Sequence, residues 1–368
     1  MPESNAMTLG DTAHRGLCAG SAGAGDDVEH ATTPWFAAAQ ELGEYIGIRF
    51  GQLPLGSSEP EWTFLIHTEY DGIGGLAELL RRRGADVGRL LQLKHPFRPS
   101  WLPLLRTAPR YLKPRRRLRW IPLQQGPSLA PGAPQPPPAV AWHVFDEGTT
   151  LQIRRVCRKA GVTVNSFLLK NLTKAIRPYL EDQSSVVPWM IPVNLRGKVT
   201  RRRDTSNHSS YIGVRVKSFE TVRDVHRNIY AALGRGEHWA NWYAYRAGWV
   251  MTAGMRKLLI AKGLATSEWY LGGFSNLGEW DPDKKITNPG CQGAWLFSPP
   301  TLRCQLLGAG CVTFQGRLTL TLQIHPDLTT ARTVAQAWVS GWLKEIAMDV
   351  ASLLDEPVTP VWAAAGQG

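Results

Sequence analysis

The chain has 368 residues, of which 43% are hydrophobic and 20% charged, and its 15 tryptophans allow it to bury a large core as one large domain or two lobes. No apolar stretch has the length of a transmembrane helix and the first residues lack the order of a signal peptide, so we expect a cytoplasmic protein or one that binds a membrane peripherally. The net charge of +12 is local, because 13 Lys/Arg and one acidic residue lie between Arg81 and Arg119.

The N-terminal part is predicted to begin with a tail and then to form one helix and two strands. Residues 1–33 are rich in Gly, Ala, Ser and Asp, which is typical of a flexible tail. We predict a helix over Pro34–Gly43 and a strand over Glu44–Gln52. The alternating aromatic and β-branched residues of Glu61–Ile66 predict a second strand, which we expect to be mostly buried.

The candidate catalytic residues follow this second strand. His67 lies at the strand end, where a rigid element would hold it, and imidazole titrates near neutral pH, which suits a general base. Asp71 is expected either to pair with an arginine or to cap the helix predicted over Gly72–Arg83. Gly72 itself is expected to adopt backbone angles that a side chain would resist. A histidine at a strand end is also typical of a structural residue, so this spacing alone does not decide its role.

Aromatic, aliphatic and basic side chains alternate along Trp101–Ile121. Prolines at 96, 99, 103, 109 and 114 argue against one continuous helix through this region. Two interpretations stay open. The segment either contacts a membrane surface or gates a substrate, or it forms an irregular, partly buried arm with a solvated basic rim.

A proline-rich stretch divides the chain. Residues 124–138 predict an extended linker between an N-terminal lobe, 34–123, and a C-terminal lobe, 139–368. Alternating strand and helix patterns in the C-terminal lobe predict an α/β fold with mixed sheets. The predicted strands cover 140–145, 186–193, 211–216, 305–314 and 317–323, and residues 274–280 are predicted as a strand end and turn. The predicted helices cover 149–159, 162–178, 222–233, 239–264 and 331–354.

The cysteines give no sign of a metal site. They are Cys18, Cys157, Cys291, Cys304 and Cys311. No two of them have the close spacing of metal ligands, and an odd, scattered set suits reduced thiols. We therefore expect free cysteines and no bound metal.

The pattern H-x-x-x-D-G at His67–Gly72, between an apolar strand and a glycine-led helix, resembles the signature of the CoA-dependent acyltransferase superfamily. This superfamily includes chloramphenicol acetyltransferase, the plant BAHD enzymes, the condensation domains of nonribosomal peptide synthetases and the wax ester synthases. Many members begin the motif with two histidines. Here Ile66 takes the place of the first, and His67 aligns with the second, catalytic one.

Four later segments resemble further elements of the superfamily and occur in the same order. They are Gly161–Leu169, Pro192–Arg196, Ser275–Gly278 and Thr313–Pro326, which resemble the helix start G-V-T-x-N-D, the strand end P-V-N-x-R, the turn S-N-x-G and the late hairpin. In the first of them Ser166 stands where aspartate is usual. Each motif alone also fits an ordinary structural role, but the ordered set over residues 61–326 is much more specific.

The resemblance implies two chloramphenicol-acetyltransferase-like lobes, each a mixed sheet flanked by helices, with an active-site tunnel between them. His67 would deprotonate a hydroxyl or amine acceptor, which then attacks a thioester carbonyl without forming an acyl-enzyme. The donor would be acyl-CoA or a phosphopantetheinyl carrier protein acting as co-substrate, so no cofactor is expected to stay bound. Because His67 comes early in the chain, the N-terminal lobe is expected to be shortened.

The resemblance also assigns roles around His67. Asp71 would point away from the substrate and pair with an arginine, holding the loop in shape. Structural support is implied for three residues, Arg196, Asn194 and Asn165, of which Arg196 is the candidate partner of Asp71. Ser275 and Asn276 would lie on the opposite lobe and stabilise the tetrahedral oxyanion; a turn that only closes the lobes is the other interpretation.

The basic segment Arg81–Arg119 predicts an anionic partner. The phosphates of CoA, an acidic carrier protein or an anionic membrane contacted by Trp101–Ile121 all fit. The sequence contains no recognised nucleic-acid-binding motif, so we expect no nucleic-acid partner. Three functions remain: a stand-alone acyltransferase acting on a small-molecule acceptor in secondary-metabolite or lipid synthesis, a membrane-surface acyltransferase of the wax ester synthase type, and a catalytically inactive scaffold or polyanion-binding protein.

Overall fold

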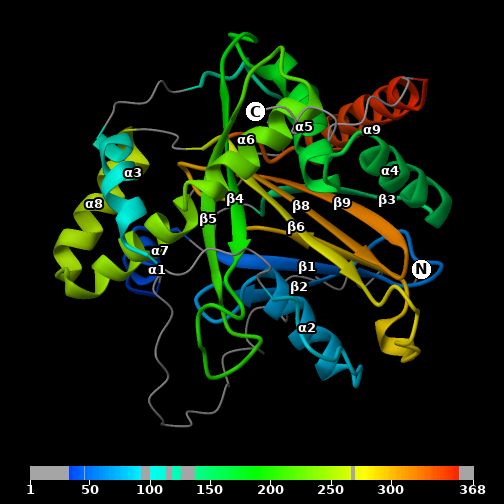
Figure 1. Ribbon diagram of the computed structural model, residues 1–368, viewed down its shortest axis with the longest axis horizontal. Helices are drawn as coiled ribbons and strands as arrows, with labels where there is room; N and C mark the ends of the chain where they lie inside the picture. Colours follow the sequence, from blue (N-terminus) through cyan, green and yellow to red (C-terminus); the bar gives the residue numbers. More distant parts are fainter. Residues whose placement is uncertain are drawn as a thin grey trace, which may run out of the picture.

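The computed structural model describes residues 33–44, 46–92, 100–112, 118–125, 137–266 and 270–355. The fold is α/β, with one sheet of three strands and one of six strands that is flanked by helices (Figure 1). The predicted tail lies outside the described residues except for Thr33. The predicted linker lies outside them between 126 and 136.

The strands are β1 (Gly47–Leu53), β2 (Glu61–Ile66), β3 (Ala139–Val144), β4 (Val187–Asn194), β5 (Ser209–Val216), β6 (Gly272–Trp280), β7 (Ala294–Ser298), β8 (Leu307–Phe314) and β9 (Arg317–Ile324). The α-helices are α1 (Thr33–Gln40), α2 (Gly72–Arg82), α3 (Leu102–Leu112), α4 (Glu147–Lys159), α5 (Val164–Ile176), α6 (Val222–Gly234), α7 (Glu237–Ala247), α8 (Ala253–Thr266) and α9 (Arg332–Asp355). Short 3₁₀ turns are η1 (Arg177–Tyr179), η2 (Gly248–Val250) and η3 (Pro289–Cys291). None of the helices within the described ranges combines the length and the apolar character needed to cross a bilayer.

The six-stranded sheet has the order β3-β9-β8-β6-β4-β5. Strand β6 runs parallel to both β4 and β8, and the other pairs are antiparallel, so the sheet is mixed as predicted. Helices α4, α5 and α9 gather over one face of the sheet (Figure 1). Trp338 and Trp342 of α9 are fully buried in the core that these elements enclose.

The three-stranded sheet joins segments that are far apart in the sequence. Its order is β2-β1-β7, and both pairs are antiparallel. Strand β7 belongs to the range predicted as the C-terminal lobe, yet it pairs with β1 of the predicted N-terminal lobe. Conversely, α1 packs on α8 and α3 packs on α7. The two halves of the fold are therefore interleaved along the chain rather than divided at the proline-rich stretch.

Glycines allow the two sheets to approach closely. A Cβ atom placed on Gly310 of β8 would lie 1.7 Å from the carbonyl oxygen of Phe297 in β7, and one on Gly308 would lie 2.4 Å from that of Pro299. The hydroxyl of Thr319 in β9 donates a 2.7 Å hydrogen bond to the carbonyl oxygen of Trp295. Backbone thus packs directly on backbone where the sheets meet.

Replacing Gly310 by alanine is expected to lower the free energy of unfolding by at least about 1–3 kcal/mol, the usual cost of overpacking a core. The clash is with a backbone oxygen, which cannot rotate away as a flexible side chain can. Urea denaturation followed by tryptophan fluorescence measures the change. Gly234→Ala is the matched control, because no atom lies within 4 Å of its new Cβ. Equal stability of the two variants would contradict this account of the sheet contact.

Most predicted elements form, and their boundaries lie within a few residues of the predicted ones. Thr163 caps α5, as one of the two candidate residues, and its hydroxyl accepts a hydrogen bond from the N–H of Ser166. The β8–β9 hairpin turns at Gln315 and Gly316, whose φ angles of 49° and 81° allow the tight connection.

Three predictions about the elements were wrong. Only Leu65 of strand β2 is buried, and Phe64 and Ile66 are 43% and 50% exposed, because β2 pairs with β1 alone among the described strands and forms an edge of its sheet. The helix predicted over 239–264 breaks into α7, η2 and α8, since Met251 is extended. Residues 274–280, predicted as a strand end and turn, belong to a full central strand, β6, whose register shifts between Asn276 and Glu279. The short helix α3 is compatible with the prediction that the prolines prevent one continuous helix through the region; Pro103 lies in its first turn, where its missing N–H is not needed.

Candidate active site

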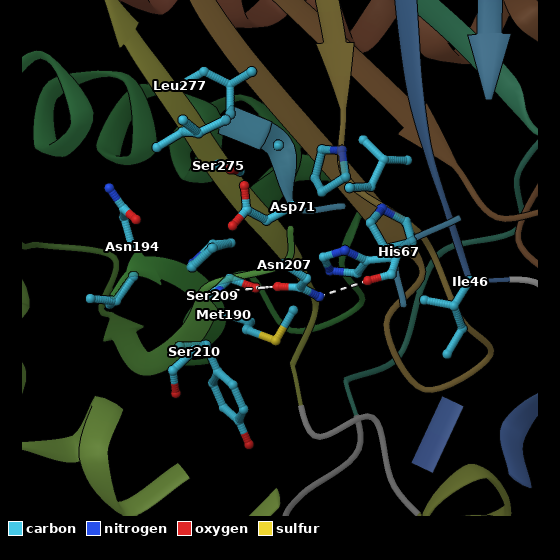
Figure 2. A pocket seen from close by; sticks show the side chains of 18 of the residues that line it. Ile46, His67, Asp71, Met190, Asn194, Asn207, Ser209, Ser210, Ser275 and Leu277 are labelled. Carbon is cyan, nitrogen blue, oxygen red and sulfur yellow. Dashed lines mark hydrogen bonds between the residues drawn. The ribbon is translucent and has the colours of Figure 1, made fainter. Parts of the chain in front are cut away.

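A cavity of about 200 Å³ lies where the two sheets meet. Both sheets contribute to its wall, as do the loop after β2, the first turn of α2, Phe36 of α1 and Tyr245 of α7. Seven of the predicted site residues line it: His67, Asp71, Gly72, Asn194, Arg196, Ser275 and Asn276. Figure 2 shows that they reach this space from different elements, with His67 on one side and Asn194 and Ser275 on the other.

His67 is held by backbone groups in one tautomer. Its Nδ1 lies 2.8 Å from the carbonyl oxygen of Tyr70. A carbonyl oxygen only accepts, so Nδ1 must carry the proton and Nε2 keeps the lone pair. The backbone N–H of His67 donates to Ile46 in a 3.2 Å hydrogen bond. The ring of Phe36 packs beside the imidazole, with 5.4 Å between the ring centroids. The side chain is therefore fixed in the form that a general base requires.

Burial lowers the pKa of His67 below its usual value of 6.5, because the charged imidazolium is poorly solvated in this position. The hydrogen bond to Tyr70 and the negative charge of Asp71 act in the opposite direction but do not outweigh burial. The imidazole is consequently neutral at pH 7. A neutral imidazole with an unprotonated Nε2 is able to accept a proton from a bound hydroxyl or amine.

The sequence offered two roles for Asp71, a helix cap and a partner of an arginine, and the structure shows both. Asp71 caps α2, since one of its carboxylate oxygens accepts the N–H of Gly74 at 2.7 Å. It also forms the predicted ion pair with Arg196, through two hydrogen bonds of 2.8 and 2.9 Å. The backbone N–H of His208 donates a further bond of 2.7 Å. In Figure 2 the carboxylate points away from the His67 ring, so Asp71 shapes the loop and does not contact the base.

The segment before β5 clamps the His67 loop, which the sequence did not reveal. Asn207 donates from its side chain to the carbonyl oxygen of His67 at 2.6 Å and from its backbone to Glu69 at 2.8 Å (Figure 2). Ser206 forms a β-bridge with Tyr70 and accepts a 3.0 Å hydrogen bond from Arg196. A polar stretch between a basic loop and a strand is the only sequence signal of this clamp.

Gly72 is required for a different reason from the one predicted. It is the first residue of α2 and does not have a positive φ angle. A Cβ atom at this position would lie 2.5 Å from Leu277 and 2.9 Å from Phe297. The motif glycine therefore provides space where α2 meets β6 and β7, and backbone freedom is not the issue.

Ser275 and Asn276 lie on β6 and line the cavity opposite the His67 loop. Within the part of the chain that the structure describes, the Ser275 hydroxyl makes no hydrogen bond, although the residue is only 7% exposed. The side-chain oxygen of Asn276 instead accepts the N–H of Gly278 at 2.9 Å and closes a turn. The hydroxyl of Ser275 can therefore donate a hydrogen bond to a bound molecule, whereas the side chain of Asn276 is already bonded within β6.

Comparison with known protein families and with curated proteins finds no match to this sequence. Comparison with solved structures finds the trichothecene 15-O-acetyltransferase TRI3 from Fusarium sporotrichioides, with a TM-score of 0.52 and 13% identity over 80% of this chain and 68% of that chain. The chain has a chloramphenicol-acetyltransferase-like fold. The identity is too low to carry activity from one protein to the other.

Two further structures are similar to parts of this chloramphenicol-acetyltransferase-like chain. One is the first condensation domain of the calcium-dependent antibiotic synthetase, with a TM-score of 0.49, 13% identity and coverage of 84% of this chain and 67% of that chain. The other is the epimerization domain of the third module of tyrocidine synthetase B, with a TM-score of 0.45 and 12% identity. That similarity covers 79% of this chain and 62% of the epimerization-domain chain.

Asn194 and Asn165 were both predicted to support the site, but only Asn194 lines the cavity. Asn194 supports the site directly: its side chain donates to the carbonyl oxygen of Leu91 at 2.7 Å and accepts the N–H of Arg196 at 3.0 Å. Asn165 does not reach the cavity. Beside it, Ser166 hydrogen-bonds to His226 at 3.1 Å and so joins α5 to α6.

The basic segment is only partly described. Residues 93–99 and 113–117, with six of its cations, lie outside the described residues, and the side chain of Arg110 is not described. Several other cations have local partners: Arg81 pairs with Asp204, Arg82 with Glu78, Arg119 with Glu181, and Arg83 lies over the ring of Trp295. These four side chains contribute to packing at the surface, so they do not form a free anion-binding cluster.

Proposed function

We propose that this protein transfers an acyl group from a thioester to a hydroxyl or amine acceptor, with His67 as the general base. The observation that carries the proposal is the hydrogen bond from His67 Nδ1 to Tyr70, which leaves Nε2 as the basic atom of a neutral imidazole at the cavity. The similarity in fold to an enzyme described as a trichothecene 15-O-acetyltransferase supports transfer to an oxygen acceptor.

The reaction then needs no covalent enzyme intermediate. As the acceptor oxygen or nitrogen attacks the thioester carbonyl carbon, its proton passes to Nε2 of His67. The tetrahedral intermediate carries its negative charge on the former carbonyl oxygen, near which the Ser275 hydroxyl is a suitable donor. Collapse breaks the carbon–sulfur bond, and the departing thiolate takes the proton back from His67. Ester or amide and free thiol are the products.

The size of the cavity limits what it holds. At about 200 Å³ it is smaller than the roughly 300–1,000 Å³ of typical small-molecule sites. The thioester and a small acceptor fit such a space, so the bulk of the donor must lie outside it. Both proposed donors, acyl-CoA and an acyl group on a phosphopantetheinyl carrier protein, carry most of their atoms away from the thioester and so are compatible with a small cavity. Roles in secondary-metabolite or lipid synthesis are consistent with either.

Release of free thiol tests the proposal directly. Acyl-CoAs of increasing chain length would be incubated with pooled alcohols and amines, with acyl carrier proteins as a second set of donors. Thiol release that depends on the acceptor supports acyl transfer, and the set of donors that works identifies the donor. Absence of release with both sets would favour a catalytically inactive scaffold or a polyanion-binding protein.

The rate is expected to depend on the protonation of His67. Because burial lowers its pKa, the acid limb of the profile of kcat/KM against pH should have its midpoint below 6.5. Below that midpoint a proton occupies Nε2 and the rate falls; above it the base is free and the rate is level. Initial rates between pH 5 and pH 8 measure this profile, with buffers matched in ionic strength. A midpoint above 7 would contradict the assigned environment of the base.

Replacing Ser275 by alanine is expected to lower kcat by about 10²–10³-fold, the cost of one oxyanion donor in other enzymes, with little change in KM. Ser210→Ala is the matched control. Ser210 also lines the cavity, but its hydroxyl already donates to the carbonyl oxygen of His238 at 2.7 Å. Similar rates for Ser275→Ala and wild type would remove the hydroxyl from the mechanism.

A further inference from the structure

One end of the molecule exposes an unusual number of large apolar side chains. Helices α3 and α8 both lie at this end, at the left of Figure 1. We call the exposed apolar residues of α3, η2 and α8, together with Trp101 just before α3, the α3/α8 surface. Its members, with their exposed fractions, are Trp101 (56%), Leu102 (56%), Leu105 (61%), Trp249 (46%), Val250 (89%), Met255 (51%), Leu258 (68%) and Leu259 (45%).

The surface is a built part of the fold. Arg256 of α8 donates to the carbonyl oxygens of Gly248 and Met251 at 2.8 and 2.5 Å, which ties η2 to α8. The ring of Trp35 packs against Gly248, and its Nε1 donates to the carbonyl oxygen of Tyr245 at 2.9 Å. The exposed side chains of η2 and α8 are therefore presented by ordered backbone.

Helix α8 has apolar residues all round. One side of it packs on α1, and the other side carries Leu258 and Met255 into solvent. The helix also contains Arg256, Lys257 and Lys262, so apolar and basic side chains are mixed along it. Large exposed apolar patches mark surfaces that bind another molecule.

The segments that carry the surface have only positive charges, although Lys257 pairs with Glu41, which follows α1, at 3.4 Å. Residues 100–112 and 246–266 contain six Lys/Arg and no Asp or Glu. Long basic side chains can lay their aliphatic stems along an apolar surface and keep the charge outside it. Apolar and basic side chains together, without acidic ones, are the composition that binds anionic lipid headgroups and the acyl chains below them.

We propose that the α3/α8 surface docks this protein on an anionic phospholipid membrane. A second copy of the chain is disfavoured as the occupant, because a symmetric contact would bring like charges together. An acidic protein partner would match the charge, but the exposed side chains project from helix surfaces, with Val250 at 89%, as in a helix that enters a bilayer interface. This surface differs from the membrane-contacting segment Trp101–Ile121 that the sequence predicted, because Trp120 of that segment stacks on Trp338 in the core.

Helices α1 and α7, which pack against the elements of this surface, also reach the cavity. Phe36 and Trp35 are neighbours on α1: Phe36 lines the cavity beside His67, whereas Trp35 supports η2. Tyr245 of α7 lines the cavity and is followed three residues later by η2. Docking at this surface would therefore bring the cavity close to the membrane, where a lipid-soluble acceptor or a long acyl chain is available. Membrane binding itself does not depend on the proposed acyl transfer.

Flotation of the full-length chain with vesicles tests the proposal. Vesicles of phosphatidylcholine alone would be compared with vesicles that also contain phosphatidylglycerol, each at low and high salt. We expect the protein to float with the anionic vesicles and to be released by salt. The double variant Val250→Ser/Leu258→Ser should bind at least about tenfold more weakly, because two aliphatic side chains no longer enter the bilayer.

Leu151→Ser is the matched control. Leu151 is 58% exposed on α4, at the opposite end of the molecule in Figure 1, and its loss should leave flotation unchanged. Wild-type protein that stays in the soluble fraction with anionic vesicles would overturn the proposal, as would equal flotation of the double variant. Light scattering that shows a dimer, broken by the double variant without any vesicle binding, would assign the surface to a second copy instead.

Discussion

Arg196→Ala is expected to lower the free energy of unfolding by about 3–5 kcal/mol, which is the usual cost of removing one partner from a buried ion pair. Arg196 and Asp71 are each only 4% exposed. Without the guanidinium, the carboxylate would remain in the interior with two backbone N–H donors, from Gly74 and His208, and no opposite charge. Urea denaturation followed by tryptophan fluorescence and circular dichroism measures the loss.

A second ion pair provides the control for this prediction. Arg81 and Asp204 also form two hydrogen bonds, both of 2.7 Å, but their side chains are 35% and 50% exposed. Exposed pairs contribute about 0.2–1 kcal/mol, because water solvates either partner when the other is removed. Arg81→Ala should therefore cost much less than Arg196→Ala. If the two variants lost the same amount, burial would not be what makes the Asp71 pair important.

The Arg196 variant also tests whether the contacts between the segment before β5 and the His67 loop hold that loop in place, apart from their effect on overall stability. Arg196 donates to the carbonyl oxygens of Asp204 and Ser206 as well as to Asp71, so it joins the motif loop to the segment before β5. Its removal should loosen the loop that positions His67. We expect hydrogen exchange of the Tyr70 and Asp71 backbone N–H groups to become faster than in wild type, whereas exchange in the β8–β9 hairpin should change only through the overall loss of stability.

Local sequence patterns predicted local structure well. The range of β2, the Thr163 cap of α5 and the turn of the β8–β9 hairpin each depend on a few neighbouring residues, and each was predicted correctly. The pairing of Asp71 with Arg196 was predicted from motifs 125 residues apart, because the resemblance supplied what spacing could not. The fold followed from the same ordered set of motifs.

Contacts between distant segments could not be predicted in this way. Strand β7 has no motif of its own, and its close contact with β8 of the other sheet depends on Gly310, which has no side chain to keep the two sheets apart. Asn207 is an ordinary polar residue in sequence and becomes part of the site only because β5 brings it beside His67. The exposure of β2 likewise follows from which strands pair, and residue pattern alone does not fix that.

His67→Ala is expected to lower kcat/KM by about 10²–10⁴-fold, the usual contribution of a general base. The loss should leave the fold intact. The clamp on this loop uses the backbone carbonyl of residue 67, which alanine retains, and the side chain contributes one hydrogen bond to Tyr70. Acceptor-dependent thiol release measures the rate, and circular dichroism with urea denaturation measures the stability.

Two comparisons connect that loss to the chemistry. His143→Ala removes a histidine of β3 that does not line the cavity, and it should retain the wild-type rate. Added imidazole should partly restore the rate of His67→Ala, because the vacated space adjoins the cavity and a free imidazole can take the proton there. Restoration that disappears at low pH, as the added imidazole becomes charged, would identify the missing function as that of a base. A His67→Ala variant with the wild-type rate would remove the base from the proposal and leave the cavity with a binding role only.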